Sequence, residues 1–523
     1  MTLPKDPQVE HRARLHALCR ELLGERRLIV ASNRGPVEYD LASDGALLPR
    51  RGRGGLVAAL SPVGQLGKMT WIASAMGEAD RRAVQAAAGA ALKPSLPGLN
   101  IDVRLVVCSR NTYHKYYNVV SNPLLWFLQH NMWNAPYTPN IDASTYDAWH
   151  SGYVTVNNAF GQAILEELRR EDASRFVILH DYQLYLVGKL VREAAPDVRL
   201  LHMVHVPWPS PSFWRLLPPP MRRAICEGLC ANDIVGFQSQ RSARAFLYTV
   251  QTFLEEAEVD VQGQTINYGG RLTQVAAYPL SIDVASIRRT GASPRVREYE
   301  EGLRARAGEL NIVRVDRVDP SRNIVRGFRA FDTLLQRHPG LVGRVKFLAF
   351  LTPARARIRE YQRNADDLMA TANQINERYA RENWRPIELF LENNYLQALA
   401  GLRLYDVLLV NAIVDGMNLV AKEGPVVNTR DGVLVLSEGT GAYEQLHDAT
   451  LAVTPTDLEG TAQALYDGLT MPPAERSRRA ELLRKLIGEE DLTMWLYHQF
   501  AGLSHLVQGS PGATTPATHE SKP

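Results

Sequence analysis

The stretch Asp415-Gly416-Met417-Asn418-Leu419-Val420-Ala421-Lys422-Glu423 follows a short apolar run, Val407-Leu408-Leu409-Val410. Such a run is typical of a buried parallel strand. Gly416 and Asn418 suit a tight turn from that strand into a helix. The N-terminus of the helix would direct unpaired N–H groups, and the positive end of its dipole, above the sheet. The stretch therefore predicts an α/β fold with an anion site, fit for a diphosphate, at a strand end.

Glu423 extends this predicted site. It lies about one helical turn beyond Leu419, so its carboxylate can face the same ligand. A carboxylate accepts two hydrogen bonds at once, which suits the two vicinal hydroxyls of a ribose. The alternative is an ordinary strand–turn–helix with a surface glutamate.

Strand and helix patterns alternate in two series along the chain, which predicts two doubly wound, Rossmann-like domains with a cleft between them. A predicted surface helix precedes the first series and ends near Glu25. The first series has strands at 28–31, 104–108, 176–180 and 199–204, with helices at 154–168 and 183–193. The second has strands at 311–315, 345–350, 407–410 and 432–436.

The composition limits the classes of function that this chain can have. The length of 523 residues indicates two or more domains, and the net charge of +3 is too small to argue for nucleic acid. The charged N-terminus has no signal-peptide core, and no apolar run reaches the ~18 residues of a membrane helix. We expect a soluble, cytoplasmic protein without membrane partners. The chain has no D-x-D and no H-E-x-x-H, so we expect no metal.

The nine residues from Asp415 resemble the sugar-nucleotide loop, D-G-M-N-L-V-x-K-E, of the trehalose-6-phosphate synthase family. These are retaining glycosyltransferases with the GT-B fold, and the resemblance runs from about Leu28 to Leu506. It implies transfer of glucose from UDP- or GDP-glucose to glucose 6-phosphate, giving α,α-trehalose 6-phosphate. The nucleoside diphosphate glucose is a substrate, and no cofactor is implied. The donor-binding residues implied are Asp415, Gly416, Met417, Asn418, Leu419, Val420 and Glu423, with Gly54 and Gly55 in a glycine-rich turn of the first domain.

The same resemblance suggests a division of the chain. We expect an N-terminal helical extension (1–27), an acceptor-binding domain (28–281), a nucleotide-sugar-binding domain (282–488), a helix that crosses back to the first domain (489–508) and a disordered tail (509–523). The oligomeric state stays open, with a homo-oligomer as one option.

Arg317 and Arg322 follow the strand that ends at Val315 and could hold the leaving diphosphate. Arginine binds phosphate bidentately and stays charged at any working pH. Negative charge grows on the leaving oxygen, so these contacts would strengthen in the transition state. The family has lysine where this chain has Arg322, and glycine where it has Asn323.

Two further predicted catalytic residues lie at strand ends. His205 matches the histidine of the family's H-x-P-[FW]-P motif, which contacts the donor sugar, whereas His202 is the better candidate for a structural role. Asp181, in His-Asp-Tyr-Gln-Leu, is expected to cap the next helix and, by resemblance, to face the reacting sugars.

The acceptor site is expected to consist of Arg34, Tyr117, Trp126 and Arg355. By resemblance, Tyr117 and Trp126 line the glucose 6-phosphate pocket, where aromatic faces suit a sugar and a phenol can bind phosphate. Arg34 and Arg355 would clamp the acceptor phosphate.

Other readings remain open. A glucosylglycerol-phosphate synthase, or a pseudo-glycosyltransferase such as validoxylamine-7′-phosphate synthase, would use the same machinery on another acceptor. Val414 and the pair Leu280-Ser281 depart from the usual family pattern and keep this reading alive. A non-catalytic sugar-phosphate sensor is the third reading, and its support is Arg322 in place of lysine.

Overall fold

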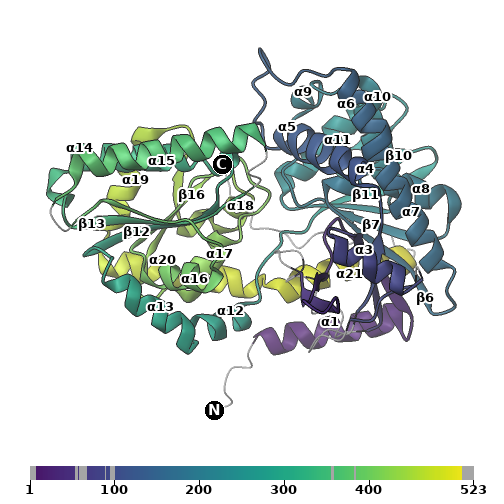
Figure 1. Cartoon of the computed structure of the whole chain (residues 1–523), viewed down its shortest axis with the longest axis horizontal. Helices are drawn as coiled ribbons and strands as arrows, with labels where there is room; N and C mark the ends of the chain where they lie inside the picture. Colours follow the sequence, from purple (N-terminus) through teal and green to yellow (C-terminus); the bar gives the residue numbers. More distant parts are fainter. Residues whose placement is uncertain are drawn as a thin grey trace.

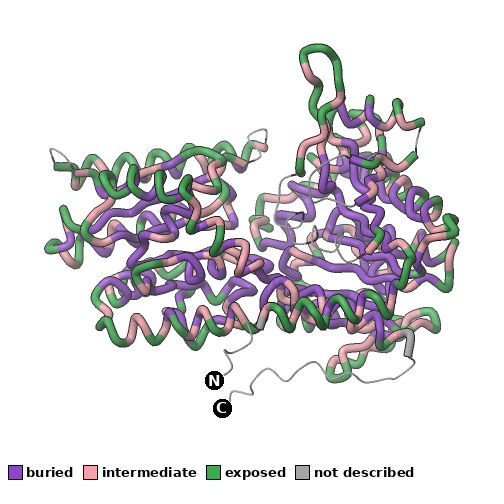
Figure 2. Tube along the Cα trace, turned by 90° about the horizontal axis from the view of Figure 1, so that it is seen from below, coloured by how far each residue is buried: buried purple, intermediate pink, exposed green. Residues whose placement is uncertain are grey.

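The computed structural model describes residues 7–52, 57, 60, 67–88, 90–94, 101–354, 358–381 and 384–508. Two lobes lie side by side, each with helices on both faces of a central sheet (Figure 1). The strands are largely buried and the exposed residues gather on the outer helices (Figure 2). The alternation of apolar strands and helices thus predicted the architecture correctly.

The first lobe is built on a sheet that has nine strands within the described residues, in the order β5-β4-β1-β6-β7-β8-β11-β10-β9. Its strands run parallel from β5 to β11, and β9 and β10 add an antiparallel edge. A separate hairpin pairs β2 with β3. The strands are β1 (Arg27–Ala31), β2 (Val37–Leu41), β3 (Leu47–Arg51), β4 (Met69–Ser74), β5 (Asp102–Val106), β6 (Ala173–His180), β7 (Arg199–Met203), β8 (Ile234–Phe237), β9 (Glu258–Asp260), β10 (Thr265–Tyr268) and β11 (Arg271–Ala277).

The second lobe has a six-stranded parallel sheet among the described residues, in the order β14-β13-β12-β15-β16-β17. Its central strands are apolar because helices cover both faces, as parallel sheets require. The strands are β12 (Leu310–Arg317), β13 (Val345–Thr352), β14 (Ile387–Phe390), β15 (Val407–Val410), β16 (Val433–Ser437) and β17 (Leu451–Val453).

Helices connect these strands. In the first lobe they are α1 (Pro7–Leu23), α3 (Glu78–Ala86), α4 (Arg110–His114), η2 (Lys115–Trp126), α5 (Phe127–Gln129), α6 (Ala143–Ala148), η3 (Trp149–Val154), α7 (Thr155–Leu168), η4 (Tyr182–Leu184), α8 (Val187–Ala194), α9 (Pro211–Trp214), α10 (Pro219–Cys230) and α11 (Gln240–Phe253). After them come α12 (Val284–Gly291), α13 (Pro294–Arg304), η5 (Pro320–Arg322), α14 (Ile324–Arg337), η6 (Pro339–Leu341), α15 (Arg359–Tyr379), α16 (Tyr395–Leu404), α17 (Val420–Val427), α18 (Ala442–Leu446), η7 (His447–Ala449), α19 (Leu458–Thr470), α20 (Pro473–Glu489) and α21 (Leu492–Gln508).

The last helix, α21, runs beneath the first lobe beside α1 (Figure 1). Its residues Trp495 and Phe500 are buried in the core on one face of the first sheet. Leu15 and Cys19 of α1 are buried in the same core, so the expected surface helix has one fully covered face. The chain therefore begins and ends its described course on the same lobe.

The parallel part of each sheet reverses its strand order at one place, between β1 and β6 in the first lobe and between β12 and β15 in the second. Ligands of open α/β sheets bind outside the carboxyl ends of the strands at such switch points. Arg317 ends β12, and Arg34, Asp181 and Asp415 come after β1, β6 and β15. The topology alone therefore directs four predicted site residues toward the space between the lobes.

Candidate active site

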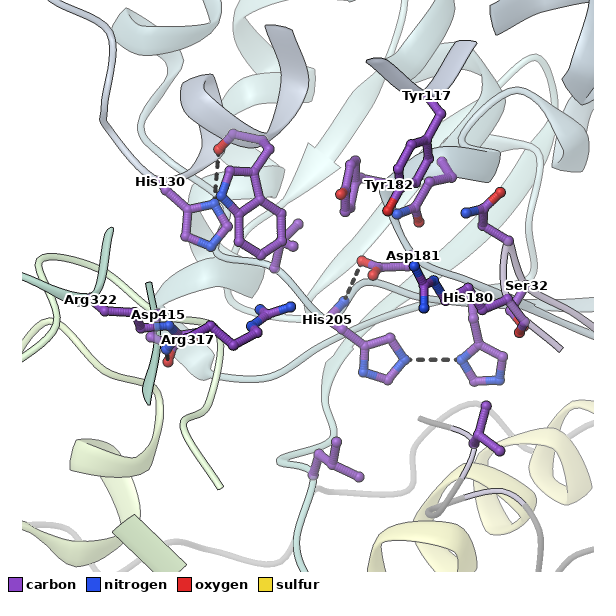
Figure 3. A pocket seen from close by; sticks show the side chains of 17 residues that line it. Ser32, Tyr117, His130, His180, Asp181, Tyr182, His205, Arg317, Arg322 and Asp415 are labelled. Carbon is purple, nitrogen blue, oxygen red and sulfur yellow. Dashed lines mark hydrogen bonds and ion pairs between the residues drawn. The ribbon is translucent and has the colours of Figure 1, made fainter. Parts of the chain in front are cut away.

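A cavity of about 310 Å³ lies between the lobes and contains most of the predicted catalytic and acceptor residues. Its volume is at the lower end of the range for small-molecule sites, roughly 300–1,000 Å³. Arg317, Arg322 and Asp415 enter from the second lobe, and Tyr117, Asp181 and His205 from the first (Figure 3). The predicted residues that line it are Arg34, Tyr117, Trp126, Asp181, His205, Arg317, Arg322 and Asp415.

Arg317 is the last residue of β12, and its exposed guanidinium points into the cavity. It lies over the ring of Trp126, with 5.8 Å from Cζ to the ring centroid, so a donor-side cation meets an acceptor-side aromatic residue across the cleft. Among the described residues no carboxylate forms an ion pair with Arg317. Its positive charge is therefore available to an anion.

Arg322 has a different environment. Its Nη1 forms an ion pair with Oδ2 of Asp415, and both side chains are largely buried, at 12% and 10% exposed. Asn418 Nδ2 donates to the same carboxylate oxygen at 3.1 Å. Beneath the loop, Arg314 Nη2 donates to the carbonyl oxygen of Arg322 at 2.9 Å. Burial, followed by repulsion from Arg317, lowers the pKa of Arg322.

Asn323 explains how the loop accommodates a residue other than glycine. Its φ is 60°, in the left-handed region that glycine adopts freely and asparagine tolerates best among the other residues. Its Nδ2 donates to the carbonyl oxygens of Asn411 at 2.9 Å and Pro455 at 2.6 Å. The side chain thus anchors a backbone conformation that glycine would adopt without support.

We predict that Arg322→Met lowers the free energy of unfolding by about 3–5 kcal/mol, because it leaves Asp415 buried without its cation. Arg322→Lys keeps the charge and should cost much less. Denaturant unfolding measures both, with Arg329→Met, which replaces an exposed arginine of α14, as the control. Equal stability of the Arg322→Met and Arg329→Met proteins would show that the pair contributes nothing.

The donor loop after β15 approaches the first lobe closely at Gly416. A Cβ on Gly416 would overlap the carbonyl oxygen of His205. Gly416 was expected to serve the turn through the conformational freedom of glycine. The turn does not need that freedom at Gly416, because Asn418 alone in this loop has a positive φ, of 76°. Glycine is required at 416 because two backbones from different lobes meet there.

The remaining donor residues are not among those that line this cavity, and they continue along the same loop and helix. Met417 is buried in the core of the second lobe, and Leu419 packs against the cores of both lobes. Val420 begins α17. Glu423 lies in its first turn, half-buried, and accepts a hydrogen bond from the Tyr395 hydroxyl at 3.5 Å. Burial raises the pKa of Glu423 to about 7, although the bond from Tyr395 lowers it.

Asp181 does not cap the turn that follows it, so that prediction was wrong. Its φ and ψ are 74° and 171°, a strained conformation for any residue but glycine. One carboxylate oxygen instead accepts from the backbone N–H of His205 at 3.3 Å. His202 is fully buried and donates from Nε2 to the Asp181 carbonyl oxygen at 3.1 Å, a contact in keeping with the structural role expected of it. The strained backbone is thus held from two sides at the cavity wall.

Tyr117 and Trp126 lie on η2, a π-helical segment with Pro123 inside it. Nine residues span about two and a half turns of an α-helix, which would place the two rings on opposite faces. The i→i+5 bonds of a π-helix add about one residue per turn, so nine residues come close to two full turns. Both side chains therefore line one cavity.

Several lining residues were missed by the sequence reasoning. His130 stacks on Trp126 with ring centroids 3.9 Å apart, and His180 bonds to His205. His130 follows Trp126 by four residues, a spacing that predicts adjacent side chains on a helix. His180, Tyr182 and Gln183 flank Asp181 in the motif His-Asp-Tyr-Gln-Leu, of which only Asp181 was predicted to belong to the site. The missed residues are Ser32, Asn33, Val57, His130, His180, Tyr182, Gln183, Val206 and Leu280.

Three predicted residues, Gly54, Gly55 and Arg355, lie outside the described residues, as does the tail from 509. In the described ranges no three histidine, cysteine or acidic side chains gather where they could hold a metal ion. No helix in these ranges has the length and apolar character to cross a membrane.

Comparison with known proteins decides the family. The model of "Glycosyltransferase family 20" matches residues 26–505, nearly the whole described chain. The chain belongs to glycosyltransferase family 20. It is therefore a glycosyltransferase, as its resemblance to the trehalose-6-phosphate synthases implied, and the two facing doubly wound domains are its GT-B fold.

Relatives that match most of this chain are named for different reactions. Validamine 7-phosphate valienyltransferase from Streptomyces hygroscopicus subsp. jinggangensis is 30% identical over 482 residues, 91% of this chain and 94% of the relative. Trehalose-6-phosphate synthase from Mycolicibacterium smegmatis is 31% identical over 510 residues, 94% and 96% of the two chains.

Solved family 20 structures share the fold over their whole length. Trehalose-6-phosphate synthase from E. coli bound with UDP-2-fluoro glucose has a TM-score of 0.77 at 26% identity, covering 91% of this chain and 98% of that one. The UDP-forming enzyme from Burkholderia xenovorans in complex with glucose-6-phosphate has a TM-score of 0.75 at 28% identity, covering 91% and 100%.

Proposed function

We propose that the chain is a trehalose-6-phosphate synthase that transfers glucose, with retention, from a nucleoside diphosphate glucose to glucose 6-phosphate. The observation that carries the proposal is Arg317, a cation without a carboxylate ion-pair partner in the described structure, which lies over the ring of Trp126 where the donor and acceptor sides meet. UDP-glucose is the donor we favour, with GDP-glucose next, and the relative solved with UDP-2-fluoro glucose supports that order.

In this proposal Arg317 and Arg322 stabilise the leaving diphosphate in different ways. Arg317 contacts the anion directly, because its guanidinium faces the cavity. Arg322 shapes the donor loop through Asp415 and adds positive potential from behind. As the glycosidic bond breaks, negative charge grows on the leaving oxygen, and cations already in place stabilise it without reorganisation.

The acceptor would lie on the first-lobe side. Tyr117 and Trp126 offer aromatic surface to a sugar ring, and Arg34, exposed after β1, lies where a phosphate could reach it. Asp181 lies at the same wall, with one carboxylate oxygen held by the His205 N–H. It would orient the reacting hydroxyls, and no covalent bond to the enzyme is required in a front-face reaction in which the donor phosphate accepts the proton.

We predict that kcat/KM for the donor falls as pH falls through about 7. Glu423 would accept hydrogen bonds from the ribose hydroxyls only as a carboxylate, and its pKa in the free enzyme is raised to about 7. Glu423→Gln should raise the donor KM and abolish this step. Burial also lowers the pKa of the adjacent Lys422 to about 7, so a step that survives Glu423→Gln would assign it to another group.

A grid of substrates tests the proposed reaction. UDP-, GDP- and ADP-glucose are paired with glucose 6-phosphate, glucose and glycerol 3-phosphate, and the products are identified by mass spectrometry. We expect a phosphorylated disaccharide only with glucose 6-phosphate. A product with glycerol 3-phosphate instead would make the enzyme a glucosylglycerol-phosphate synthase, and binding of glucose 6-phosphate without any product would favour a sensor.

The second candidate is a pseudo-glycosyltransferase that couples cyclitols. It is supported by the 30% identity to a validamine 7-phosphate valienyltransferase over 91% of the chain. Validamine 7-phosphate therefore belongs in the grid as an acceptor, together with a nucleoside diphosphate valienol as donor. Turnover in that combination alone would replace the proposed reaction.

A further inference from the structure

The ring of His205 is held at both nitrogens by the protein. Its Nδ1 lies 2.9 Å from Gln238 Nε2, and its Nε2 lies 3.0 Å from Nδ1 of His180 (Figure 3 shows the pair of histidines). The ring therefore has no nitrogen to offer a substrate unless one of these hydrogen bonds breaks. The orientation of the His205 ring at the cavity wall therefore depends on Gln238 and His180.

The protons in this chain follow from one fixed donor. The backbone N–H of Leu280 donates to Gln238 Oε1 at 2.7 Å, and a backbone N–H can only donate. The oxygen of the Gln238 amide must therefore face Leu280, so its NH₂ faces His205 and donates to Nδ1. A neutral His205 then has its proton on Nε2, which donates to His180 Nδ1. His180 in turn has its proton on Nε2.

Burial keeps both rings neutral. His180 is fully buried and His205 is half-buried beside it, and Gln238, which contacts His205, is 1% exposed. Burial, and then the neighbouring His205, lowers the pKa of His180 well below its usual value, and burial lowers that of His205 to about 3. The Nε2 of His180 is buried with no hydrogen-bond partner among the described residues. A single tautomer of each ring is thus selected by hydrogen-bond geometry.

Leu280 links this chain to the second lobe. It belongs to the segment that connects β11 to α12, and it also lines the cavity. Its carbonyl oxygen accepts from Nζ of the fully buried Lys422, at 2.9 Å, and Lys422 precedes Glu423 on α17. Gln238 is therefore hydrogen-bonded to a backbone segment that Lys422 of the second lobe holds in place.

We propose that Gln238 is a positioning residue for glycosyl transfer: held by the Leu280 N–H, its amide locks His205 in the Nε2-protonated tautomer and fixes its ring at the cavity wall. Gln238 comes directly after β8 and does not line the cavity. Its effect on catalysis passes through His205. The kinetic part of the inference rests on the proposed function, whereas the tautomer does not.

The tautomer is measured by long-range ¹H–¹⁵N NMR on the full chain labelled at histidine, without substrate. The chain has 13 histidines, and His205→Asn and His180→Asn variants assign the two resonances. We expect protonated Nε2 and unprotonated Nδ1 at His205. Protonated Nδ1 in the unmodified protein would overturn the proposal, whatever any variant does.

The variant Gln238→Glu tests whether this tautomer matters for catalysis. One carboxylate oxygen can still accept from Leu280 while the other demands a proton on His205 Nδ1, so the tautomer should invert or the ring become charged. We expect kcat to fall on the order of 10- to 100-fold, by analogy with outer partners of histidine ligands, with smaller changes in either KM. Gln251→Glu, the same change on the exposed face of α11, is the control.

Gln238→Leu, which removes both hydrogen bonds without adding charge, guards against an effect of charge alone. Thermal unfolding checks that each variant is folded. A folded Gln238→Glu protein with an inverted tautomer and unchanged kcat would contradict the positioning role. If the substrate grid yields no product, the NMR result still stands, so the two failures are distinguishable.

Discussion

Replacing Arg317 by alanine should lower kcat by roughly 10²–10³-fold, the scale for removing one preorganised donor to developing charge. The guanidinium ends β12, faces the cavity and has no ion-pair partner among the described residues, so nothing within them competes with the diphosphate for it. An interaction made chiefly in the transition state lowers kcat and kcat/KM together, so the donor KM should change little. Steady-state kinetics with both substrates varied makes the measurement.

Arg329→Ala is the matched control, because it removes an exposed arginine from α14, the helix that follows the same loop. It should leave both constants near those of the unmodified enzyme. If Arg317→Ala raised the donor KM and left kcat unchanged, Arg317 would bind the ground state and transition state equally. The leaving-group role would then be wrong.

Gly416→Ala should reduce kcat by roughly 10²-fold, the scale of a misplacement of about 1 Å at a reacting centre. The added methyl would overlap the carbonyl oxygen of His205, and it would also crowd the Cα of Val206 at 3.3 Å. Both are backbone atoms of the other lobe, which cannot turn aside as a flexible side chain would. The lobes must separate, or the loop that carries Asp415 must move.

The matched control is Gly302→Ala on α13, where an added Cβ meets no atom within 4 Å. That change should stabilise its helix slightly, because alanine is the better helix former. Small-angle scattering of the Gly416→Ala protein should show a more open arrangement of the lobes, with each lobe still folded. Wild-type kinetics in this variant would show that the contact between the lobes does not matter for turnover.

Local patterns were sufficient to predict the two domains and the side of each sheet on which the site lies. The run Val407–Val410 is a buried strand with the predicted bounds, and the closing helix, expected within 489–508, spans Leu492–Gln508. Strands are recognisable because helices cover both faces and leave only apolar side chains. Helix 183–193 was less accurate, since its first turn is the separate turn η4 and α8 begins only at Val187. Chain direction and strand alternation then place loops such as 317–323 and 415–419 at the carboxyl ends of strands.

What the residues determined by themselves is therefore the fold class, the family and the positions of the motifs. Tertiary structure decided how those motifs act on one another. Arg322 pairs with Asp415, Gly416 meets His205, and a π-helix brings Tyr117 and Trp126 to one face. Each of these depends on atoms that are far apart in sequence or on a helical period that no local pattern announces. Local sequence preferences determine which segments form helices and strands. The contacts between the two lobes are determined only when both sheets are folded and packed against each other.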